Sequence, residues 1–347
     1  MKEEGKSTRR GKGVVLVLVC ALLGILLASM DARDAAQVLH QARWIYVPVA
    51  VLCTALSYGC LSGGYTAIHR VFGIRLPRRD LLEIGFISFA LNNLLSIGGT
   101  AGYSLRLVLL RRRGLAAGDV LAASLVHSYL NHIVMMSLLP LGLLYLLLRH
   151  PLGRTQTESL AAASALALLL LAGSTVLLGH RAARSKAARF VGAASRRLLR
   201  RDVEPVLRHL DATLGAGMDA IRARPGLLVL PVLLVLGDWA TSVLALDFCF
   251  RALGEALHPG VLLTGFALGV TLGFLSMLPG GMGVQEGSMV GTYALLGVDY
   301  ERAVLASMLF RVLYYLLPFA VSLLLYVRLL RGEIRSSPMP EIPAREL

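Results

Sequence analysis

The sequence predicts an all-α protein that crosses a membrane several times, and three observations support this fold class. Of the 347 residues, 56% are hydrophobic and only 16% are charged. Apolar runs close to or above the roughly 20 residues that a helix needs to cross a bilayer recur along the whole chain. The longest stretch without such a run, 180–224, is shorter than a domain that normally folds alone. These features exclude a soluble enzyme with a large aqueous core.

The charge balance agrees with this class. The chain has 35 Lys and Arg against 21 Asp and Glu, which gives a net charge of +14. In membrane proteins, basic residues gather in cytoplasmic loops, where they also attract anionic lipid headgroups. No basic folded module accompanies the charge, so we expect no nucleic-acid partner. The four cysteines lie inside apolar runs and form no CxxC motif, so we expect no disulfide, metal site or cofactor.

The predicted elements follow in order along the chain. We expect residues 1–13 to form a cytoplasmic tail and the apolar run 14–29 to form an uncleaved first helix, because no clean small-residue cleavage site follows it. A cleaved signal peptide is the alternative. Five further runs are long enough for full spans, so the membrane domain covers 14–330 and a cytoplasmic tail follows at 331–347. These runs are 44–68, 120–148, 160–179, 227–250 and 303–330.

The segment 180–224 is rich in Lys and Arg and is predicted to be a cytoplasmic loop. Within it, apolar residues such as Phe190 and Val191 alternate with arginines. This pattern suits a helix that lies on an anionic membrane surface and is broken at Pro205. A solvated linker is the alternative.

Two further apolar segments, 81–110 and 261–297, are each interrupted by glycines. If both are re-entrant hairpins that return to the side they entered, most Lys and Arg fall on the cytoplasmic side. If the first segment instead crosses fully, the basic clusters at 70–79 and 111–113 lie on opposite sides. We therefore predict six full spans, two re-entrant hairpins and cytoplasmic termini. The two breaks are Gly98-Gly99-x-x-Gly102 and Pro279-Gly280-Gly281-x-Gly283.

The order of elements indicates an inverted repeat. Span, broken hairpin and span follow one another in 44–148 and again in 227–330, but the two hairpins enter from opposite sides. Inverted repeats with broken helices near the midplane form the substrate sites of many transporters. Non-helical backbone at membrane depth is tolerated only inside protein or against water, so we expect the breaks to face each other or a cavity. Their free amides suit a phosphate or carboxylate. Alternatively, the glycines only permit close helix packing.

Ionisable residues inside the apolar runs complete the predicted site. Arg106 follows the first break and Glu286 the second, while Asp238 and Arg311 lie within full spans. Buried charges are costly in hydrocarbon and are kept mostly for transport pathways or mutual pairing. Arg311 either binds a lipid phosphate or pairs with Glu286, and a static ion pair that locks two helices is the structural alternative. Asp238 is equally open to a structural role.

The predicted substrate-binding residues are drawn from both breaks and from these charges. We expect no catalytic residue and no metal ligand, because His127 and His132 are five positions apart and do not share a helix face. The predicted set is Asn92, Gly98, Gly99, Arg106, Asp238, Pro279, Gly280, Gly281, Gly283, Glu286 and Arg311.

The second break carries a resemblance to a known family. The sequence LPGGMGVQE at 278–286, then Leu296-Gly297-Val298, and Arg311 in the last span resemble the signature of the lysylphosphatidylglycerol synthase transmembrane family, also called the flippase-like or UPF0104 family. Asn92, the glycines at 98–99 and Arg106 look like its N-terminal counterpart. The resemblance covers about 14–330. It departs from the family at Ile97, where a proline often precedes the glycines.

The resemblance implies a function in lipid handling. In bifunctional members, a membrane domain of this kind moves a lipid that a following cytosolic aminoacyltransferase domain makes. This chain ends soon after the last predicted span, so we expect no transferase and no enzyme. The implied protein is a flippase-like protein of a prokaryotic cytoplasmic membrane that translocates or binds an anionic or aminoacylated (glyco)phospholipid.

Two other functions stay open. One is a secondary transporter of a small polar solute, driven by protons through Glu286 or Asp238. The other is a non-transporting protein that presents a lipid to an envelope enzyme. Membrane lipids, most of all anionic phospholipids, are the expected partners in the first interpretation, and a homo-oligomer or an enzyme partner is left open.

Overall fold

The chain is helical throughout the part that the computed structural model describes, which comprises residue 24 and residues 30–74, 76–95, 100–149, 153–199 and 204–336. No strand occurs in these residues. Five stretches are long and apolar enough to cross a membrane, and they coincide with five of the six predicted spans. Apart from Gly24, the sixth predicted span, 14–29, lies outside the described residues.

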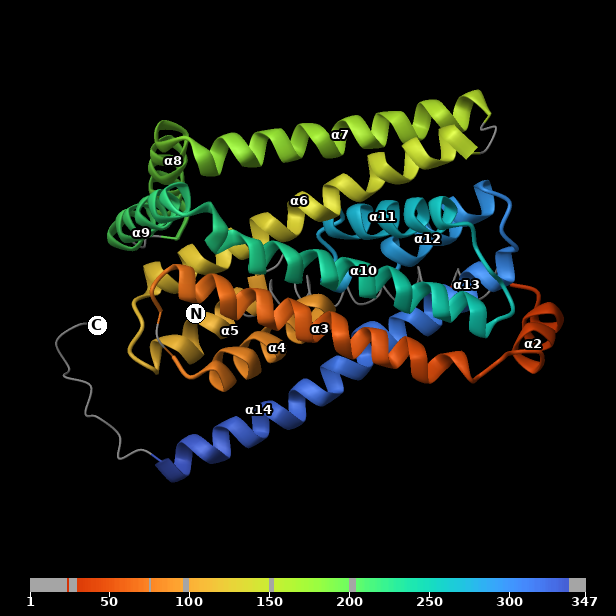
Figure 1. The fold of residues 1–347 in the computed structure, drawn as a ribbon, viewed down its shortest axis with the longest axis horizontal. Helices are drawn as coiled ribbons and strands as arrows, with labels where there is room; N and C mark the ends of the chain where they lie inside the picture. The colour runs from red at the N-terminus through yellow and green to blue at the C-terminus, as the bar shows by residue number, and fades with distance from the viewer. Residues whose placement is uncertain are drawn as a thin grey trace.

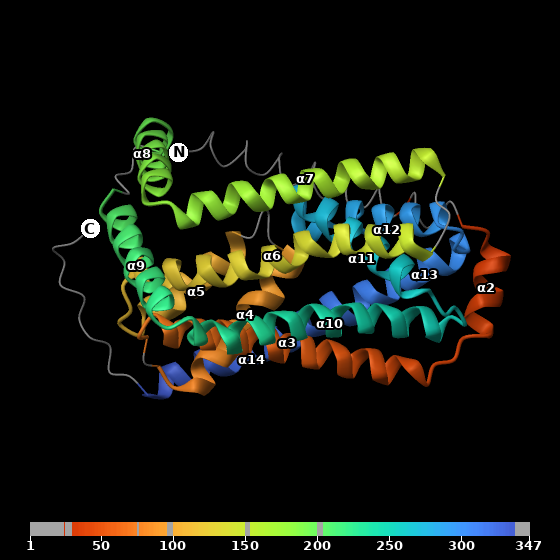
Figure 2. The same cartoon turned by 45° about the horizontal axis from the view of Figure 1, so that its top comes forward.

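The five stretches form the body of the molecule (Figure 1). They are α3 (Tyr46–Val71), α6 (Ala117–Arg149), α7 (Arg154–Gly179), the 3-10 turn η1 (Pro225–Leu228) continued by α10 (Val229–Ala252), and the continuous helix made of α13 (Tyr300–Phe310), the π-helical segment η3 (Arg311–Leu316) and α14 (Leu317–Ser336). Figure 2 shows these long helices running along the same axis, with α3 beside α10 and α6 beside α7.

Shorter helices close the two ends of the body (Figure 1). At one end lies α2 (Ala32–His40), and at the other lie α8 (Arg181–Leu199) and α9 (Glu204–Ala223). The predicted basic loop therefore contains two helices, and residues 200–203 between them lie outside the described residues. Pro205 stands in the first turn of α9, where the missing N–H of a proline costs no helical hydrogen bond.

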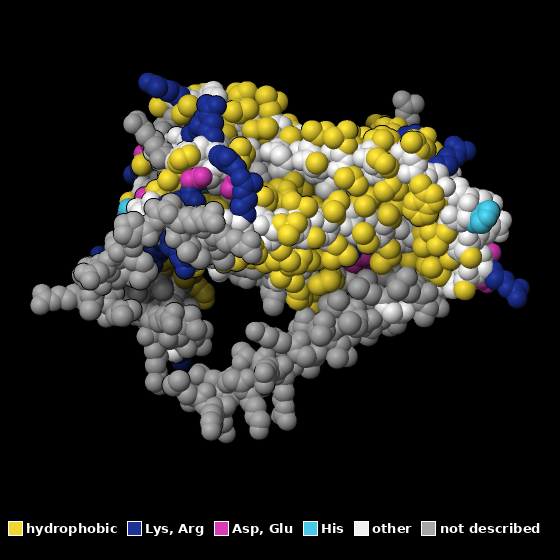
Figure 3. Space-filling view, turned by 90° about the horizontal axis from the view of Figure 1, so that it is seen from below, with side chains coloured by type: hydrophobic (Ala, Val, Ile, Leu, Met, Phe, Trp, Pro, Cys, Tyr) yellow, Lys and Arg dark blue, Asp and Glu magenta, His cyan; other side chains and the backbone are white. Residues whose placement is uncertain are grey.

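The surface between the two ends is apolar. Figure 3 shows hydrophobic side chains across the middle of one face and Lys and Arg side chains toward its ends. Exposed leucines on the long helices, such as Leu169, Leu233 and Leu324, contribute to such a surface. Soluble monomers rarely expose continuous apolar patches of this kind, so the surface is suited to contact with lipid chains.

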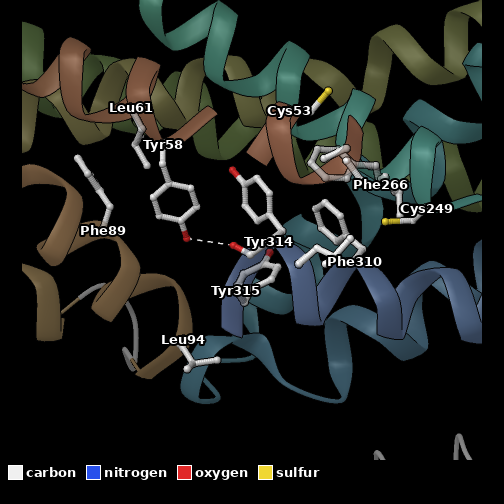
Figure 4. Close-up of a cluster of buried hydrophobic side chains, with 14 of the residues drawn as sticks. Cys53, Tyr58, Leu61, Phe89, Leu94, Cys249, Phe266, Phe310, Tyr314 and Tyr315 are labelled. Carbon is white, nitrogen blue, oxygen red and sulfur yellow. Dashed lines mark hydrogen bonds between the residues drawn. The ribbon is translucent and has the colours of Figure 1, made fainter. Parts of the chain in front are cut away.

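Aromatic side chains fill the centre of the body (Figure 4). The rings of Phe310 and Tyr314 stack with their centroids 4.9 Å apart. The hydroxyl of Tyr58 on α3 donates to the backbone carbonyl of Tyr314 at 3.2 Å. That carbonyl lies in the π-helical segment, where the wider turn changes the regular backbone pairing. The aromatic centre thus fixes η3 against α3.

The second glycine-broken segment folds back on itself. It consists of α11 (Pro259–Leu275), the short turn η2 (Pro279–Gly281) and α12 (Val284–Leu295). Gly265 faces Tyr293 and Gly273 faces Gln285, so the two helices are antiparallel. A Cβ at either glycine would overlap the facing side chain, because each would lie under 3.0 Å from it. Glycines at this spacing therefore allow the close contact of α11 with α12.

The first glycine-broken segment also folds back. Its two helices are α4 (Arg78–Leu95) and α5 (Thr100–Arg111). Gly102 of α5 lies against Asn92 of α4, and the guanidinium of Arg106, one turn further along α5, lies over the ring of Phe89, nearly one turn earlier in α4. The connecting glycines Gly98 and Gly99 lie outside the described residues.

The second break, residues 276–283, meets the end of α4. Gly280, Gly281 and Gly283 have φ values of +59°, +62° and +81°, which side chains with a Cβ rarely adopt. The position of a Cβ on Gly280 would be 2.5 Å from the carbonyl oxygen of Leu94, at the last turn of α4. The second break therefore packs against the last turn of α4. Residues 96–99 of the first break lie outside the described residues, so whether the two breaks face each other stays a prediction.

Candidate functional site

A cavity of about 210 Å³ lies where the second break meets α4. Its walls come from α3, α4, α6, α10, α11, the second break, α12 and η3. Phe274, at the end of α11, is the exposed residue of the lining and marks the open side of the cavity. The polar residues of the lining are Asn92, Asn93, His127, Ser128, Asn131, His132, Asp238, Ser242, Gln285, Tyr314 and Tyr315.

Asp238 on α10 is the acidic residue of this lining. One carboxylate oxygen accepts a hydrogen bond from the hydroxyl of Ser57, which in turn contacts the hydroxyl of Tyr314 at 2.7 Å. Asp238 is only 4% exposed, and none of the described Lys, Arg or His side chains forms an ion pair with it. A buried carboxylate without a cationic partner is costly, so this wall is suited to a cation, an amine, a proton or a hydroxyl group.

A second polar contact joins two walls of the cavity. The indole N–H of Trp239 donates to the side-chain oxygen of Asn131 at 2.8 Å, which connects α10 to α6. The position of Trp239 next to Asp238 in the sequence places an aromatic face and a carboxylate at neighbouring points of the wall. Aromatic faces beside a carboxylate favour organic cations.

Glu286 and Arg311 form a buried ion pair beside the cavity. The Nε of Arg311 donates to the Oε1 of Glu286 at 2.5 Å, and its Nη1 donates to the carbonyl of Gly280 at 2.9 Å. The Oε2 of Glu286 accepts from the backbone N–H of Gly283 at 2.7 Å, at the start of α12. The guanidinium also lies 4.2 Å over the ring of Tyr315. These contacts tie the second break to η3 and fit the static ion pair that the sequence left open.

Arg106 occupies a different environment in the first half. Its side chain is 2% exposed, and its guanidinium lies over three rings, those of Phe89 at 4.1 Å, Tyr65 at 4.7 Å and Tyr103 at 5.4 Å. Its Nε has no hydrogen-bond partner, and no described carboxylate forms an ion pair with it. Because Phe89 also lines the cavity, Arg106 lies directly behind the cavity wall.

The structure brings together part of the predicted site. Asn92, Asp238, Gly280 and Gly281 line the cavity. Two further predicted residues, Pro279 and Gly283, belong to the second break beside the cavity. Glu286 accepts from Gly283, and Arg311 donates to Gly280, so both hold this break. Arg106 lies behind Phe89. Gly98 and Gly99 lie outside the described residues.

Several lining residues were not in the predicted set. Asn131 and Gln285 are neutral amides in apolar runs, and His127 was an ionisable residue of an apolar run that was left out of the predicted set. Uncharged polar residues inside a span were the available signal, but this signal is common in membrane helices. Among the described residues, no group of three or more His, Cys, Asp or Glu side chains is placed to hold a metal ion.

Comparisons with known proteins cover most of the chain. A family model described as "Lysylphosphatidylglycerol synthase TM region" matches residues 13–322. A protein of Methanothermobacter thermautotrophicus named "UPF0104 membrane protein" is 33% identical over 89 residues, which are 26% of this chain and 25% of that protein. A second match to a protein of the same name and organism is 20% identical over 309 residues, which are 88% of this chain and 91% of that protein.

Proposed function

The chain belongs to the lysylphosphatidylglycerol synthase transmembrane-region family, and from this premise we propose that it is a flippase-like protein that carries a phospholipid headgroup through the cavity. The observation that supports this most is the polar cavity at the meeting point of the second break and α4, inside an otherwise apolar helical body. A polar, partly open cavity at membrane depth is where a headgroup can leave water without losing its hydrogen bonds.

The lining chemistry favours a headgroup with amine or hydroxyl groups. The backbone amide of Gly283, at the start of α12, already donates to the carboxylate of Glu286, so it is not available to bind an anion. The cavity instead offers the Asp238 carboxylate, amides such as Asn131, and aromatic rings. Among anionic and aminoacylated (glyco)phospholipids, we therefore favour an aminoacylated one, whose amine pairs with Asp238.

The proposed membrane arrangement has six full spans, two re-entrant hairpins related as an inverted repeat, and both termini on the cytoplasmic side of a prokaryotic cytoplasmic membrane. Two features support it. Both glycine-broken segments fold back on themselves, and the basic helices α8 and α9 gather at one end of the body.

Cysteine labelling tests this arrangement. In a variant whose native cysteines are replaced by serine, we expect Thr155→Cys at the start of α7 to react with a membrane-impermeant maleimide in intact cells. We expect Lys186→Cys on α8 to react only after permeabilisation, because the two exposed positions lie at opposite ends of α7. Labelling of Lys186→Cys alone in intact cells would reverse the orientation, and labelling of both would exclude α7 as a span.

Asp238→Asn tests the proposed headgroup site. The asparagine keeps an oxygen that can accept from Ser57 but removes the charge. We expect translocation of a fluorescent lysyl-phosphatidylglycerol in proteoliposomes, followed by dithionite quenching, to slow by about tenfold or more, since a hydrogen bond to a charged group contributes about 1.5 to 3 kcal/mol.

The matched control is Asp247→Asn on the same helix. Asp247 pairs with Arg251 at 2.6 Å and does not line the cavity, so this variant should translocate at the wild-type rate. Equal rates for wild type and Asp238→Asn would remove the amine site from the proposal. No lipid movement by the wild-type protein would remove the flippase function itself.

The carboxylate of Asp238, which has no ion-pair partner among the described residues, also favours one second candidate, a proton-coupled transporter of a small polar solute. This function requires solute uptake that depends on a pH gradient and is lost in Asp238→Asn. Lipid binding without movement of either lipid or solute would instead support a protein that presents a lipid to an enzyme.

A further inference from the structure

Unpartnered polar atoms gather around Arg106. In the described part of the chain, seven buried nitrogen and oxygen atoms from six side chains in this region have no hydrogen-bond partner. Buried polar groups are nearly always paired, so a group of unpaired ones needs an explanation. These side chains, which we call the Arg106 cluster, are Ser62, Tyr65, His69, Arg106, Ser124 and His127.

Helix geometry brings the cluster together around Tyr65. Ser62, Tyr65 and His69 are spaced to lie on one face of α3. The ring centroid of Tyr65 lies 4.0 Å from that of His69 and 5.9 Å from that of His127 on α6. The guanidinium carbon of Arg106 on α5 lies 4.7 Å from the ring centroid of Tyr65. Three helices therefore bring these side chains into one region.

Tyr103 connects Ser124, on α6, to the rest of the Arg106 cluster. Its hydroxyl donates to the backbone carbonyl of Ser124 at 3.4 Å, and its ring lies 5.4 Å from the guanidinium carbon of Arg106. Ser124 is itself fully buried, and its hydroxyl has no partner at hydrogen-bond distance among the described residues. Tyr103 thus connects Ser124 on α6 to Arg106 on α5.

The cluster is rich in donors and lacks a carboxylate. Guanidinium, serine and tyrosine groups can all donate, and imidazole donates through each protonated nitrogen. The aromatic rings around Arg106 attract the cation but accept none of its hydrogen bonds in the usual geometry. Arg311 in the second half is different, because its nitrogens bond to Glu286 and to the carbonyl of Gly280. None of the described carboxylates supplies Arg106 with the counter-charge that Glu286 supplies to Arg311.

We propose that the Arg106 cluster binds one phosphate-type oxyanion. The guanidinium fork matches the oxygens of a phosphate, and the hydroxyl and imidazole groups complete the contacts. His127 also lines the cavity, so the site adjoins the space in which we placed the headgroup. This inference rests on the proposed function in one respect, since the phosphate of a lipid bound there would lie at the Arg106 wall while its amine faces Asp238.

The source of the phosphate is either a lipid phosphodiester or free inorganic phosphate. The test uses the full-length protein, delipidated in detergent, and measures its thermal unfolding midpoint against three probes. These are dioleoyl phosphatidylglycerol, inorganic phosphate, and glucosyl diacylglycerol, which is a lipid without phosphate. We expect phosphatidylglycerol to raise the midpoint of the wild-type protein and the phosphate-free lipid to raise it less.

Arg106→Gln is the central variant, and we expect it to weaken the affinity for phosphatidylglycerol by about tenfold or more. Its matched control is Arg111→Gln, which changes an exposed arginine on the same helix and should bind like the wild type. Without any probe, Arg106→Gln should unfold at the wild-type temperature or above it, because it removes a buried charge that has no counter-charge among the described residues. A structural arginine would instead lower this temperature.

The results of these measurements distinguish a site for the phosphate group alone, a site for a lipid phosphodiester, and no anion site. Competition between inorganic phosphate and phosphatidylglycerol in the wild type, lost in Arg106→Gln, supports a site for the phosphate group alone. An effect of the lipid without such competition supports a site for the lipid phosphodiester. Equal stabilisation by the two lipids, or unchanged affinity in Arg106→Gln, overturns the proposal and leaves water as the occupant. Loss of binding in Arg106→Gln together with no lipid movement by the wild type would remove translocation but keep the anion site.

Discussion

Arg311→Ala should destabilise the folded protein by about 3 to 5 kcal/mol, because it leaves a buried carboxylate without its counter-charge. Glu286 is 1% exposed, and Arg311 is the cation paired with it. The substitution also removes the donor to the carbonyl of Gly280, so the second break loses its link to η3. The expected results are a low yield of folded protein from membranes and a lower denaturant midpoint in detergent.

The matched control is Arg302→Ala, which breaks the pair between Arg302 on α13 and Glu255 in the segment that joins α10 to α11. Arg302 contacts Glu255 at 2.5 Å, but both side chains are about one-third exposed. Pairs with this much exposure contribute about 0 to 1 kcal/mol, so Arg302→Ala should be close to the wild type in stability. If Arg311→Ala folds with wild-type stability yet fails to move lipid, the pair belongs to the transport path, as the predicted substrate-binding set has it.

The fold was largely predictable because it depends on local properties of the sequence. The length of the apolar runs locates the five described spans, since a helix must pair its backbone polar groups by hydrogen bonds, and present apolar side chains, along the whole width of a bilayer. The second break was predictable because Gly280, Gly281 and Gly283 need positive φ values. Helix α2 was not predicted, because a short helix in a loop leaves only a weak periodic signal.

The candidate site was less predictable because it depends on contacts between distant segments. Asp238 was identified because a charge inside an apolar run is costly. The sequence could not decide whether Glu286 contacts substrate or Arg311, since that depends on how α12 packs against η3. The importance of His127 was hidden for a similar reason. Its missing partners become visible only once α3, α5 and α6 are placed together.

Gly280→Ala is expected to disrupt the junction between the second break and α4. The left-handed backbone at φ +59° alone costs a residue with a Cβ about 1 to 2 kcal/mol. In addition, the new methyl carbon would lie 2.5 Å from the carbonyl oxygen of Leu94 and 2.8 Å from that of Asn93. These are backbone atoms of a helix end and cannot rotate away, so either the break or the end of α4 must shift.

Because both Gly280 and Asn93 line the cavity, such a shift changes its shape directly. We therefore expect Gly280→Ala to lower the denaturant midpoint and to abolish lipid movement in the dithionite assay. The matched control is Gly287→Ala in α12, where a Cβ would meet nothing within 4 Å and the backbone is helical. That variant should be as stable as the wild type or slightly more stable, since alanine favours a helix over glycine by about 1 kcal/mol. Wild-type stability and transport in Gly280→Ala would mean that the break does not need its contact with α4. The junction of the break with α4 would then not form a wall of the transport cavity.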